Sequence, residues 1–454
     1  MNDRIDEYRA AYARLKADPQ GSLIDARPAI FSPAIAAQDE HNPKTALKRF
    51  GPQYLVHEFT NWTEEALAHS ESCYLGDWSG LAKVVVTGPD AHAFLSWLGM
   101  NDLSRFEIGR IKHHVQLDEQ GFVASEGVLV RRGEQEFQYT AGSGDWLLWR
   151  LAQGEWDAEA VDVSPERFVF GVQGPRSIGV LEAALGASLR DLAFNRFRPA
   201  SLDGLAVEVL RTGISGELGY EIHGPAEAAN DVWRRLRDAG GPFGLRELGL
   251  RSQSVQHIES GIATNGLDYF PSSAVTPGKA WQFRQGGVGG SFVPSAFSDY
   301  FRRPGELGWD VRGDLSHEFL GRDALIAERE AGGSARVLMG LVWNAEDVAE
   351  VLTAPLRAGD EPLPEPMELP RLQGPTFDTV LVDGRAVGVS SGRALSPALR
   401  AMISLVAIER SLAVVGTEVI VVWGAPGTAQ RELRATVAAL PFKPDRRRVD
   451  VTAA

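Results

Sequence analysis

One short pattern occurs twice in the chain, and it limits the folds that the sequence can adopt. Residues 84–99, "VVVTGPDAHAFLSWLG", and residues 168–185, "FVFGVQGPRSIGVLEAAL", each read as an apolar strand, a Gly-Pro turn and a helix. Apolar runs bounded by Gly and Pro favour strands, and the apolar spacing after each turn favours a helix. Neither unit carries the G-x-G-x-x-G pattern that opens a helix in a dinucleotide-binding fold. Two related α+β subdomains are therefore expected instead of a Rossmann fold.

The rest of the chain adds further elements to this pair. The spacing predicts a helix within residues 6–17, another over 62–70, and three strands over 113–142 that turn at Gly121 and Gly133. A stretch rich in Pro, Glu and Leu, about 345–375, predicts an irregular excursion. The Val- and Ile-rich segments that follow it predict a small antiparallel barrel or sandwich.

Composition excludes several classes of protein. The 454 residues suggest roughly three domains, and no apolar run approaches the roughly 18 residues of a membrane span. A net charge of −14 disfavours nucleic acid as a partner. The single cysteine, Cys73, excludes an intramolecular disulfide, and the histidines show no metal-binding spacing, so no metal is expected. The charged N-terminus lacks the apolar stretch of a signal peptide, which favours a cytoplasmic protein.

The segment "RTGISGELGYEIHGP", residues 211–225, combines a glycine-rich turn with a short strand. It has two interpretations. It is either a hairpin with an edge strand that leaves Glu221 in solvent, or a loop whose backbone approaches a flat ligand that Glu221 holds. The stretch alone favours the first interpretation, since glycine-rich turns outnumber ligand sites.

A series of segments in fixed order resembles the aminomethyltransferase (glycine-cleavage T-protein) family, from about residue 55 to residue 443. The segments are residues 86–110, 115–130, 170–175, 211–225, 257–269 and 384–408, with "LPF" after them. Two further stretches, residues 57–79 and 286–325, are similar to the tetrahydrofolate-dependent aryl O-demethylases, which act on methoxylated aromatic acids such as vanillate and syringate.

Three departures separate the chain from the glycine-cleavage enzymes of that family. Asp77-Trp78-Ser79-Gly80 stands where they carry Asp-Leu-Ser-His, and Ser125-Glu126 stands where they carry Asp-Asp. The segment His257 to Gly261 replaces Arg-Leu-Glu-Ala-Gly. These departures argue against the lipoyl-bound aminomethyl reaction and leave folate binding in place as a hypothesis.

The resemblance implies an α+β fold: a three-domain ring with two related α+β domains and a C-terminal antiparallel β-barrel. On this basis we expect a first folate-binding domain from residues 1–75 with 165–255. Residues 76–164 with 256–315 would form the second domain, and residues 316–454 the barrel.

The resemblance also implies tetrahydrofolate as the cofactor and assigns roles to residues. Glu221, in the Gly-Tyr-Glu stretch, takes the position of the glutamate that binds the pterin, which reverses the preference stated above for this segment. Tyr269 is the leading proton donor, because a phenol with a pKa near 10 matches a phenolate leaving group. The full candidate set is Tyr269, His257 and Glu126 as catalytic residues, Glu221, Arg251, Gln173 and Tyr220 as cofactor-binding residues, and Trp62, Tyr54 and His113 as substrate-binding residues. Gln173 is expected mainly to support its own turn.

The implied function is transfer of a methyl group from a small methoxylated aromatic compound to N5 of tetrahydrofolate, within catabolism of lignin-derived aromatics, by a monomer or homodimer. The carboxylate-binding arginine of the resembling branch is absent at Ala141-Gly142-Ser143, so the substrate either lacks a carboxylate or uses another cation, with Lys279, Arg284 and Arg393 as candidates. Three alternatives stay open: an N-methyl or S-methyl donor, a glycine-cleavage-like aminomethyltransferase, and a folate-binding protein without catalysis.

Overall fold

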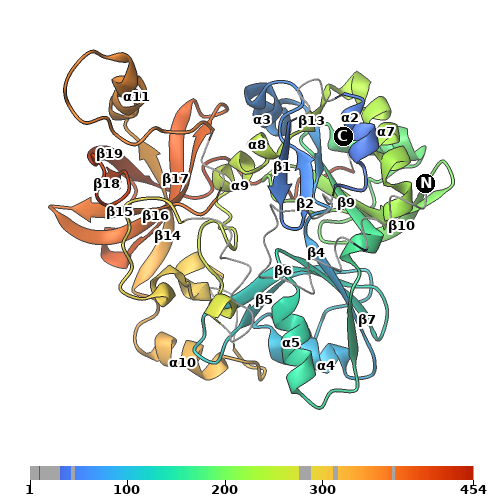
Figure 1. Ribbon diagram of the computed structural model, residues 1–454. Coiled ribbons are helices and arrows are strands. Elements are labelled where there is room, and N and C mark those ends of the chain that lie inside the picture. Colours follow the sequence, from blue (N-terminus) through green and yellow to red (C-terminus); the bar gives the residue numbers. More distant parts are fainter. Residues whose placement is uncertain are drawn as a thin grey trace. The chain divides into compact units, whose positions relative to one another are not determined.

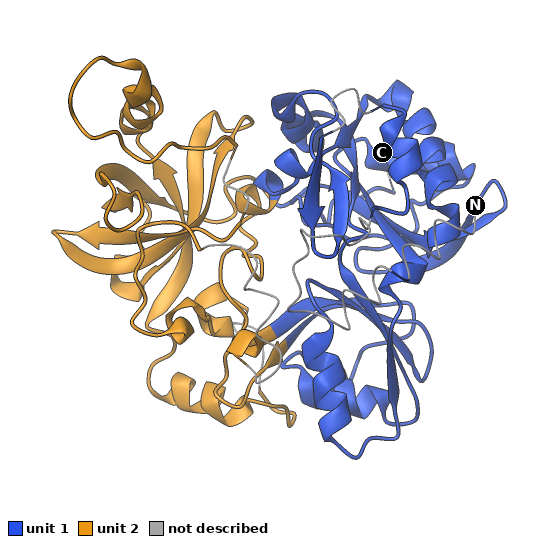
Figure 2. Ribbon diagram, in the orientation of Figure 1, with its two compact units in different colours: residues 1–115, 125–256, 445–454 blue, residues 116–124, 257–444 orange. Residues whose placement is uncertain are grey.

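The computed structural model describes Ala10 and residues 31–41, 46–275, 288–309, 315–370 and 374–452. The chain forms two compact units, which Figure 2 shows in different colours. The first comprises residues 1–115, 125–256 and 445–454, and the second comprises 116–124 and 257–444. The helix expected within residues 6–17 lies, except for Ala10, outside the described residues. The three-part division into 1–75 with 165–255, 76–164 with 256–315, and 316–454 stays a prediction.

The first unit contains a six-stranded sheet in the order β10-β11-β12-β9-β3-β13. Figure 1 labels β9, β10 and β13 of this sheet. Its strands are β3 Cys73–Asp77, β9 Arg167–Gln173, β10 Phe197–Leu202, β11 Leu205–Leu210, β12 Gly219–Pro225 and β13 Leu245–Leu248. One face packs on helices α2 Ile35–Asp39, α6 Ser177–Leu185 and α7 Ala229–Gly240 to form the core.

Alternation along the strands and amphipathicity of α7 explain this packing. Phe170 and Tyr220 point to the helices from neighbouring strands, and Trp233 of α7 lies edge-on to Phe170 with ring centroids 5.0 Å apart. Each such side chain contributes about 1.5–3 kcal/mol through burial. Smaller elements of the first unit are β1 Leu47–Phe50, β2 Gln53–Val56, α3 Trp62–Glu71 and α8 Leu250–Gln253. Helix α9 Val255–Glu259 begins in the first unit and ends in the second. The predicted helix over 62–70 is confirmed by α3.

A second sheet has five strands in the order β5-β6-β7-β4-β8. They are β4 Ala82–Thr87, β5 Ile111–Leu117, β6 Val123–Arg131, β7 Glu136–Ala141 and β8 Glu159–Asp162, accompanied by helices α4 Ala91–Leu98 and α5 Asp145–Gln153. The predicted strands over 113–142 are confirmed by β5, β6 and β7. The tip of the β5–β6 hairpin, residues 116–124, is assigned to the second unit.

The repeated strand, turn and helix pattern is confirmed by β4–α4 and β9–α6, and the two turns share their backbone geometry. Gly88 has φ +122° and Gly174 has φ +132°, and each precedes a proline. A Cβ at Gly88 would lie 2.6 Å from the carbonyl oxygen of Asp157, and one at Gly174 would lie 2.5 Å from that of Ser72. Glycine is therefore required at both turns for the same two reasons, positive φ and close backbone approach.

The second unit contains a closed barrel of six antiparallel strands in the order β14-β17-β16-β15-β18-β19 (Figure 1). The strands are β14 Arg336–Trp343, β15 Phe377–Val382, β16 Arg385–Ser396, β17 Ala401–Glu409, β18 Glu418–Trp423 and β19 Arg431–Ala438. The predicted C-terminal antiparallel barrel is confirmed. Helix α10 Arg322–Glu330 precedes β14.

The irregular excursion expected over 345–375 begins instead with a helix, α11 Ala345–Thr353. The Asn344 side chain caps this helix by accepting hydrogen bonds from the backbone N–H groups of Glu346 and Asp347. Val348 and Val351, three residues apart, are buried on one side. The high content of Pro and Glu in the whole stretch obscured this short amphipathic segment. Among the described residues, no helix combines the length and apolar character needed to cross a membrane.

Candidate functional site

A row of three residues crosses the six-stranded sheet. Gly76 of β3 pairs with Gly171 of β9, and Gly171 pairs with Glu221 of β12. Residues that pair across neighbouring strands project to the same face. Because the core residues Phe170 and Tyr220 alternate with the row, it lies on the face away from the core. The two glycines leave a flat floor of backbone next to the Glu221 carboxylate.

Aromatic side chains approach this floor closely. A Cβ built on Gly171 would lie 2.7 Å from Nε1 of Trp78, and one built on Gly76 would lie 3.1 Å from Cε2 of Tyr74. Tyr74 is completely buried, and burial raises its pKa, so its hydroxyl stays protonated. The floor is thus bordered by an indole, a phenol and a carboxylate.

The glycine-rich loop before β12 encloses the side chain of Gln173. A Cβ at Gly213 would lie 2.4 Å from Oε1 of Gln173, and one at Gly219 would lie 2.8 Å from its Cγ. The Ser215 backbone N–H donates to the same oxygen at 3.1 Å. The amide of Gln173 therefore supports this loop, whereas the sequence had predicted support of its own turn at residues 173–175. The glycines are needed here for contact with Gln173.

Glu221 is paired with a residue that the sequence reasoning missed. Nε2 of His223 lies 2.9 Å from Oε2 of Glu221, and the histidine side chain is only 1% exposed while the glutamate side chain is 17% exposed. Residues two apart on a strand share a face, so the Glu-x-His spacing within a predicted strand was the signal available. Tyr220, which directly precedes Glu221 and is in register with Val172, points to the other face and packs in the core, where burial raises its pKa to about 12. This placement gives Tyr220 a packing role, and its prediction as a cofactor-binding residue draws no support from it.

Two other candidates meet in the five-stranded sheet. Nε2 of His113 on β5 lies 2.9 Å from Oε2 of Glu126 on β6. The neighbouring Ser125 hydroxyl is buried and lies 2.8 Å from the hydroxyl of Tyr139. The structure therefore joins one predicted catalytic residue and one predicted substrate-binding residue in a single hydrogen-bonded pair.

Arg251 and Trp62 also come together in the first unit. The Arg251 guanidinium lies 5.8 Å from the centroid of the Trp62 ring and donates through Nη1 to Oε2 of Glu58 at 2.7 Å. Tyr54 lies apart from this pair on β2, opposite Arg49 in the β1–β2 hairpin, with its ring 6.4 Å from that of Phe31.

The second unit holds the remaining two candidates. Nε2 of His257 lies 3.2 Å from Oδ2 of Asp268, and both side chains are buried. The same carboxylate oxygen accepts the Thr264 backbone N–H at 2.8 Å, which fixes it in the loop. Tyr269 follows directly, is fully buried, and lies edge-on to Trp309 with centroids 6.1 Å apart.

Of the three cations considered for a substrate carboxylate, Lys279 and Arg284 lie outside the described residues. Arg393 is buried in the second unit, where its guanidinium lies 4.9 Å from the Trp423 ring centroid and donates to the Glu368 carbonyl at 3.1 Å. Within the ranges described, no cluster of three or more His, Cys, Asp or Glu side chains forms a metal site.

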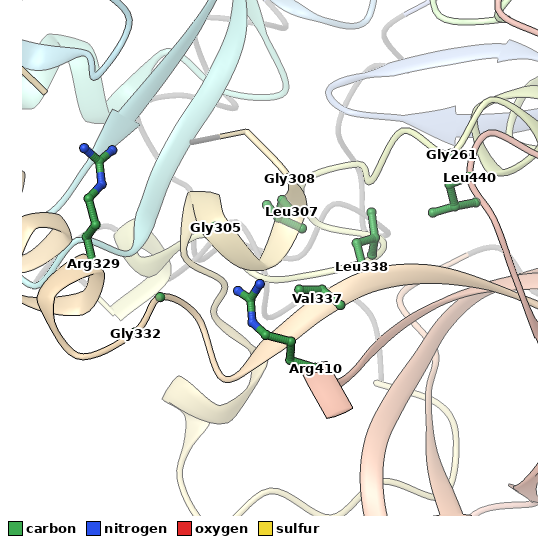
Figure 3. Close-up of a pocket in the computed structure, with 11 residues that line it drawn as sticks. Gly261, Gly305, Leu307, Gly308, Arg329, Gly332, Val337, Leu338, Arg410 and Leu440 are labelled. Atoms are coloured by element: carbon green, nitrogen blue, oxygen red, sulfur yellow. The ribbon is translucent and has the colours of Figure 1, made fainter. Parts of the chain in front are cut away.

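A cavity of about 590 Å³ opens in the second unit. Figure 3 shows Arg329 of α10 and Arg410, which follows β17, on opposite sides of Gly332. The rest of the lining is glycine backbone and apolar side chains: Gly261, Gly305, Leu307, Gly308, Gly333, Val337, Leu338 and Leu440. None of the ten predicted site residues is among these lining residues.

Comparison with known proteins identifies the family. The profile of the GCVT N-terminal domain family matches residues 27–279. The chain belongs to the aminomethyltransferase family. The sesamin methylene transferase of a Sinomonas species is 36% identical over 412 residues, covering 85% of this chain and 89% of that protein. The syringate O-demethylase of a Sphingobium species is 30% identical over 419 residues, with the same two coverages of 85% and 89%.

A solved structure supports the fold. The glycine cleavage system aminomethyltransferase T of Bartonella henselae matches with a TM-score of 0.69 at 19% identity, covering 92% of this chain and 98% of that chain. The fold is therefore the α+β aminomethyltransferase fold with its C-terminal barrel. As a member of the aminomethyltransferase family, close to its aryl O-demethylase branch, the chain is an enzyme of one-carbon transfer that uses tetrahydrofolate.

Proposed function

We propose that this aminomethyltransferase homologue is an O-demethylase that moves the methyl group of a small methoxylated aromatic compound to N5 of tetrahydrofolate, leaving a phenol. The observation that carries this proposal is the buried pair of His257 and Asp268 directly before Tyr269. This histidine occupies the position at which glycine-cleavage enzymes carry an arginine. An imidazole–carboxylate pair that directly precedes a tyrosine in the chain suits proton transfer better than binding of an anion. The relative that is named for syringate demethylation supports the same reaction class.

The floor around Glu221 fits the cofactor. A pterin offers an amino group and a ring N–H along one edge, and an ionised carboxylate accepts both in charge-assisted hydrogen bonds. Oε1 of Glu221 accepts no hydrogen bond from the described residues, and Oε2 keeps a second lone pair beyond the one facing His223. The Trp78 indole lies against Gly171 and the Tyr74 ring lies against Gly76, so aromatic groups stand beside it. Glu221 would thus hold the donor edge of tetrahydrofolate.

The bound cofactor supplies the nitrogen that accepts the methyl group. In the overall exchange the bond from methyl carbon to ether oxygen breaks, a bond from that carbon to nitrogen forms, the nitrogen loses its proton, and the ether oxygen gains one. Tyr269 would donate the proton to the ether oxygen, since its ordinary pKa near 10 is close to that of the phenol formed. The His257–Asp268 pair fixes the backbone at Asp268 and hence the start of the tyrosine side chain.

The test is a panel of methyl donors. Purified enzyme with tetrahydrofolate is offered methoxyarenes with and without a carboxylate, glycine betaine and a sulfonium compound, and both products are measured by mass spectrometry. We expect 5-methyl-tetrahydrofolate and a phenol from a methoxyarene only. Transfer only from the onium donors, or folate binding without any turnover, would replace this proposal with one of the alternatives stated above.

A second candidate reaction is favoured by the relative that is 36% identical, which is named as a methylene transferase. In that case the donor would be an aromatic ether whose one-carbon unit bridges two oxygens, and two phenol groups would be left. The panel therefore includes a methylenedioxyarene. Methylenetetrahydrofolate with a catechol product would assign methylene transfer to the enzyme, and only 5-methyl-tetrahydrofolate would assign methyl transfer.

A further inference from the structure

We propose that His223 is a positioning residue that sets the orientation of the Glu221 carboxylate for the cofactor. The proposal rests on the assignment of Glu221 to tetrahydrofolate made above. His223 lies two residues after Glu221 on β12, so both side chains project from the same face of the sheet. Their 2.9 Å hydrogen bond, between Nε2 and Oε2, joins a buried donor to a partly exposed acceptor.

The hydrogen bond determines where the imidazole proton lies. An ionised carboxylate only accepts hydrogen bonds, so Nε2 of His223 carries the hydrogen. Nδ1 is buried and has no hydrogen-bond partner in the part of the chain that the structure describes. A doubly protonated ring would bury a second N–H without an acceptor, which costs more than an idle lone pair. His223 therefore carries a hydrogen on Nε2 that is aimed at Glu221.

The carboxylate on the neighbouring strand β11 is already engaged and does not accept the hydrogen bond of His223. Glu208 of β11 lies directly opposite His223 in register. Its carboxylate is held by two arginines, since Oε2 accepts from Arg132 at 2.6 Å and from Arg167 at 2.7 Å, and Oε1 also accepts from Arg132. With Glu208 engaged in this way, Glu221 is the carboxylate to which the histidine donates.

The consequence for binding is orientational. A glutamate side chain has several rotatable bonds, and ordering it costs conformational entropy. A buried partner with a fixed position orders the carboxylate before the cofactor binds. The entropy lost in this ordering therefore does not reduce the free energy of binding. The bond also occupies one lone pair of Oε2, which leaves Oε1 and the second lone pair for a ligand edge with two adjacent donors.

The experiment compares glutamine and asparagine as replacements for His223. Nε2 of a glutamine occupies nearly the position of histidine Nε2, whereas the asparagine amide reaches only to the position of Nδ1. His223→Leu and His223→Asn are expected to raise the Kd for tetrahydrofolate about tenfold, and His223→Gln to stay within about twofold of wild type. Binding is measured by calorimetry and folding by thermal unfolding, so that loss of affinity in a folded variant is distinguished from misfolding. A purely structural histidine would give equal affinity in all three folded variants, and that result would overturn the proposal.

A double-mutant cycle separates this proposal from the assignment of Glu221 itself. Glu221→Gln should weaken tetrahydrofolate binding by at least tenfold, and in that background His223→Leu should change Kd less than twofold, because the carboxylate it positions is gone. Wild-type affinity in Glu221→Gln would remove Glu221 from the cofactor site. A full tenfold effect of His223→Leu in the Glu221→Gln background would show that the histidine acts by another route, and would overturn only the positioning role.

Discussion

Tyr269 is the residue on which the proposed chemistry depends most directly. If its hydroxyl protonates the leaving oxygen, Tyr269→Phe should lower kcat for the methoxyarene at least a hundredfold and leave KM within about threefold, because the interaction is made in the transition state. The aromatic ring and its edge-on contact with Trp309 are retained in this variant. Steady-state kinetics with the best donor of the panel measures the effect. Tyr300→Phe, which removes a hydroxyl from another largely buried tyrosine, is the control and should leave kcat unchanged.

Unchanged turnover in Tyr269→Phe would transfer the role of acid to another group. His257 would then be tested next, since it is the other titratable candidate in the second unit, and the Glu126–His113 pair after it.

Glu247 gives a prediction about stability and pH. Burial raises the pKa of its carboxyl to about 7, even though the Trp233 indole N–H donates to it at 2.6 Å. The unfolded group titrates near 4.3, so the folded state binds more protons than the unfolded state between about pH 4.3 and 7. The contribution of the protonated Glu247 carboxyl to stability is therefore complete below that range and lost as the pH rises through 7. Glu247→Gln keeps the acceptor for Trp233 and does not titrate. Its free energy of unfolding relative to wild type should rise by about 1–3 kcal/mol from pH 5 to pH 8.

Urea unfolding of Glu247→Gln and wild type at several pH values in this range measures the difference. Two stability curves that run parallel from pH 5 to pH 8 would mean that Glu247 titrates normally in the folded protein.

At the scale of elements, the glycine row makes a prediction about the sheet face. Gly171→Ala should place a methyl group on the floor beside Glu221 and displace the Trp78 indole, which would lie 2.7 Å from the new carbon. We expect the Kd for tetrahydrofolate to rise about tenfold, while the free energy of unfolding falls by no more than about 2 kcal/mol. Gly241→Ala is the matched control, because a Cβ there meets nothing within 4 Å.

Calorimetric titration measures the Kd for tetrahydrofolate in both glycine variants. Wild-type affinity in Gly171→Ala would place the cofactor away from this row, whatever the role of Glu221.

The elements also show what the sequence could and could not predict. The Gly-Pro turns at Gly88 and Gly174 were predictable because positive φ and close packing leave a strong local signal. Helix α11 was missed because its flanks carry the composition of a loop. The partner of Glu221 was missed because the Glu-x-His spacing places both side chains on one face of the strand but does not show that the histidine is buried there. The Arg251–Glu58 pair joins positions far apart in the chain, and no local spacing indicates such a contact.

At the scale of the molecule, the C-terminal residues return to the first unit. The side chain of Val451 is 3% exposed and belongs to the core between the sheet and its helices. Val451→Ala should lower the free energy of unfolding by about 1–3 kcal/mol, since it removes two buried carbons and leaves a cavity. Val449→Ala, in the same segment at 44% exposure, should change it by less than about 0.5 kcal/mol. Chemical denaturation of both variants measures the contrast, and equal effects would show that the segment does not pack as described.

The same segment has a consequence for the order of events during synthesis. Arg211 is buried and donates to the carbonyl oxygens of Leu192 and Val449, so one of its two acceptors is synthesised after residues 257–444 of the second unit. At 5–20 residues per second, the chain between residue 256 and residue 445 takes on the order of ten seconds or more to emerge. During that interval the core of the first unit lacks Val451, although most of the unit has already been translated. The core of the first unit is thus completed only after the second unit has been synthesised.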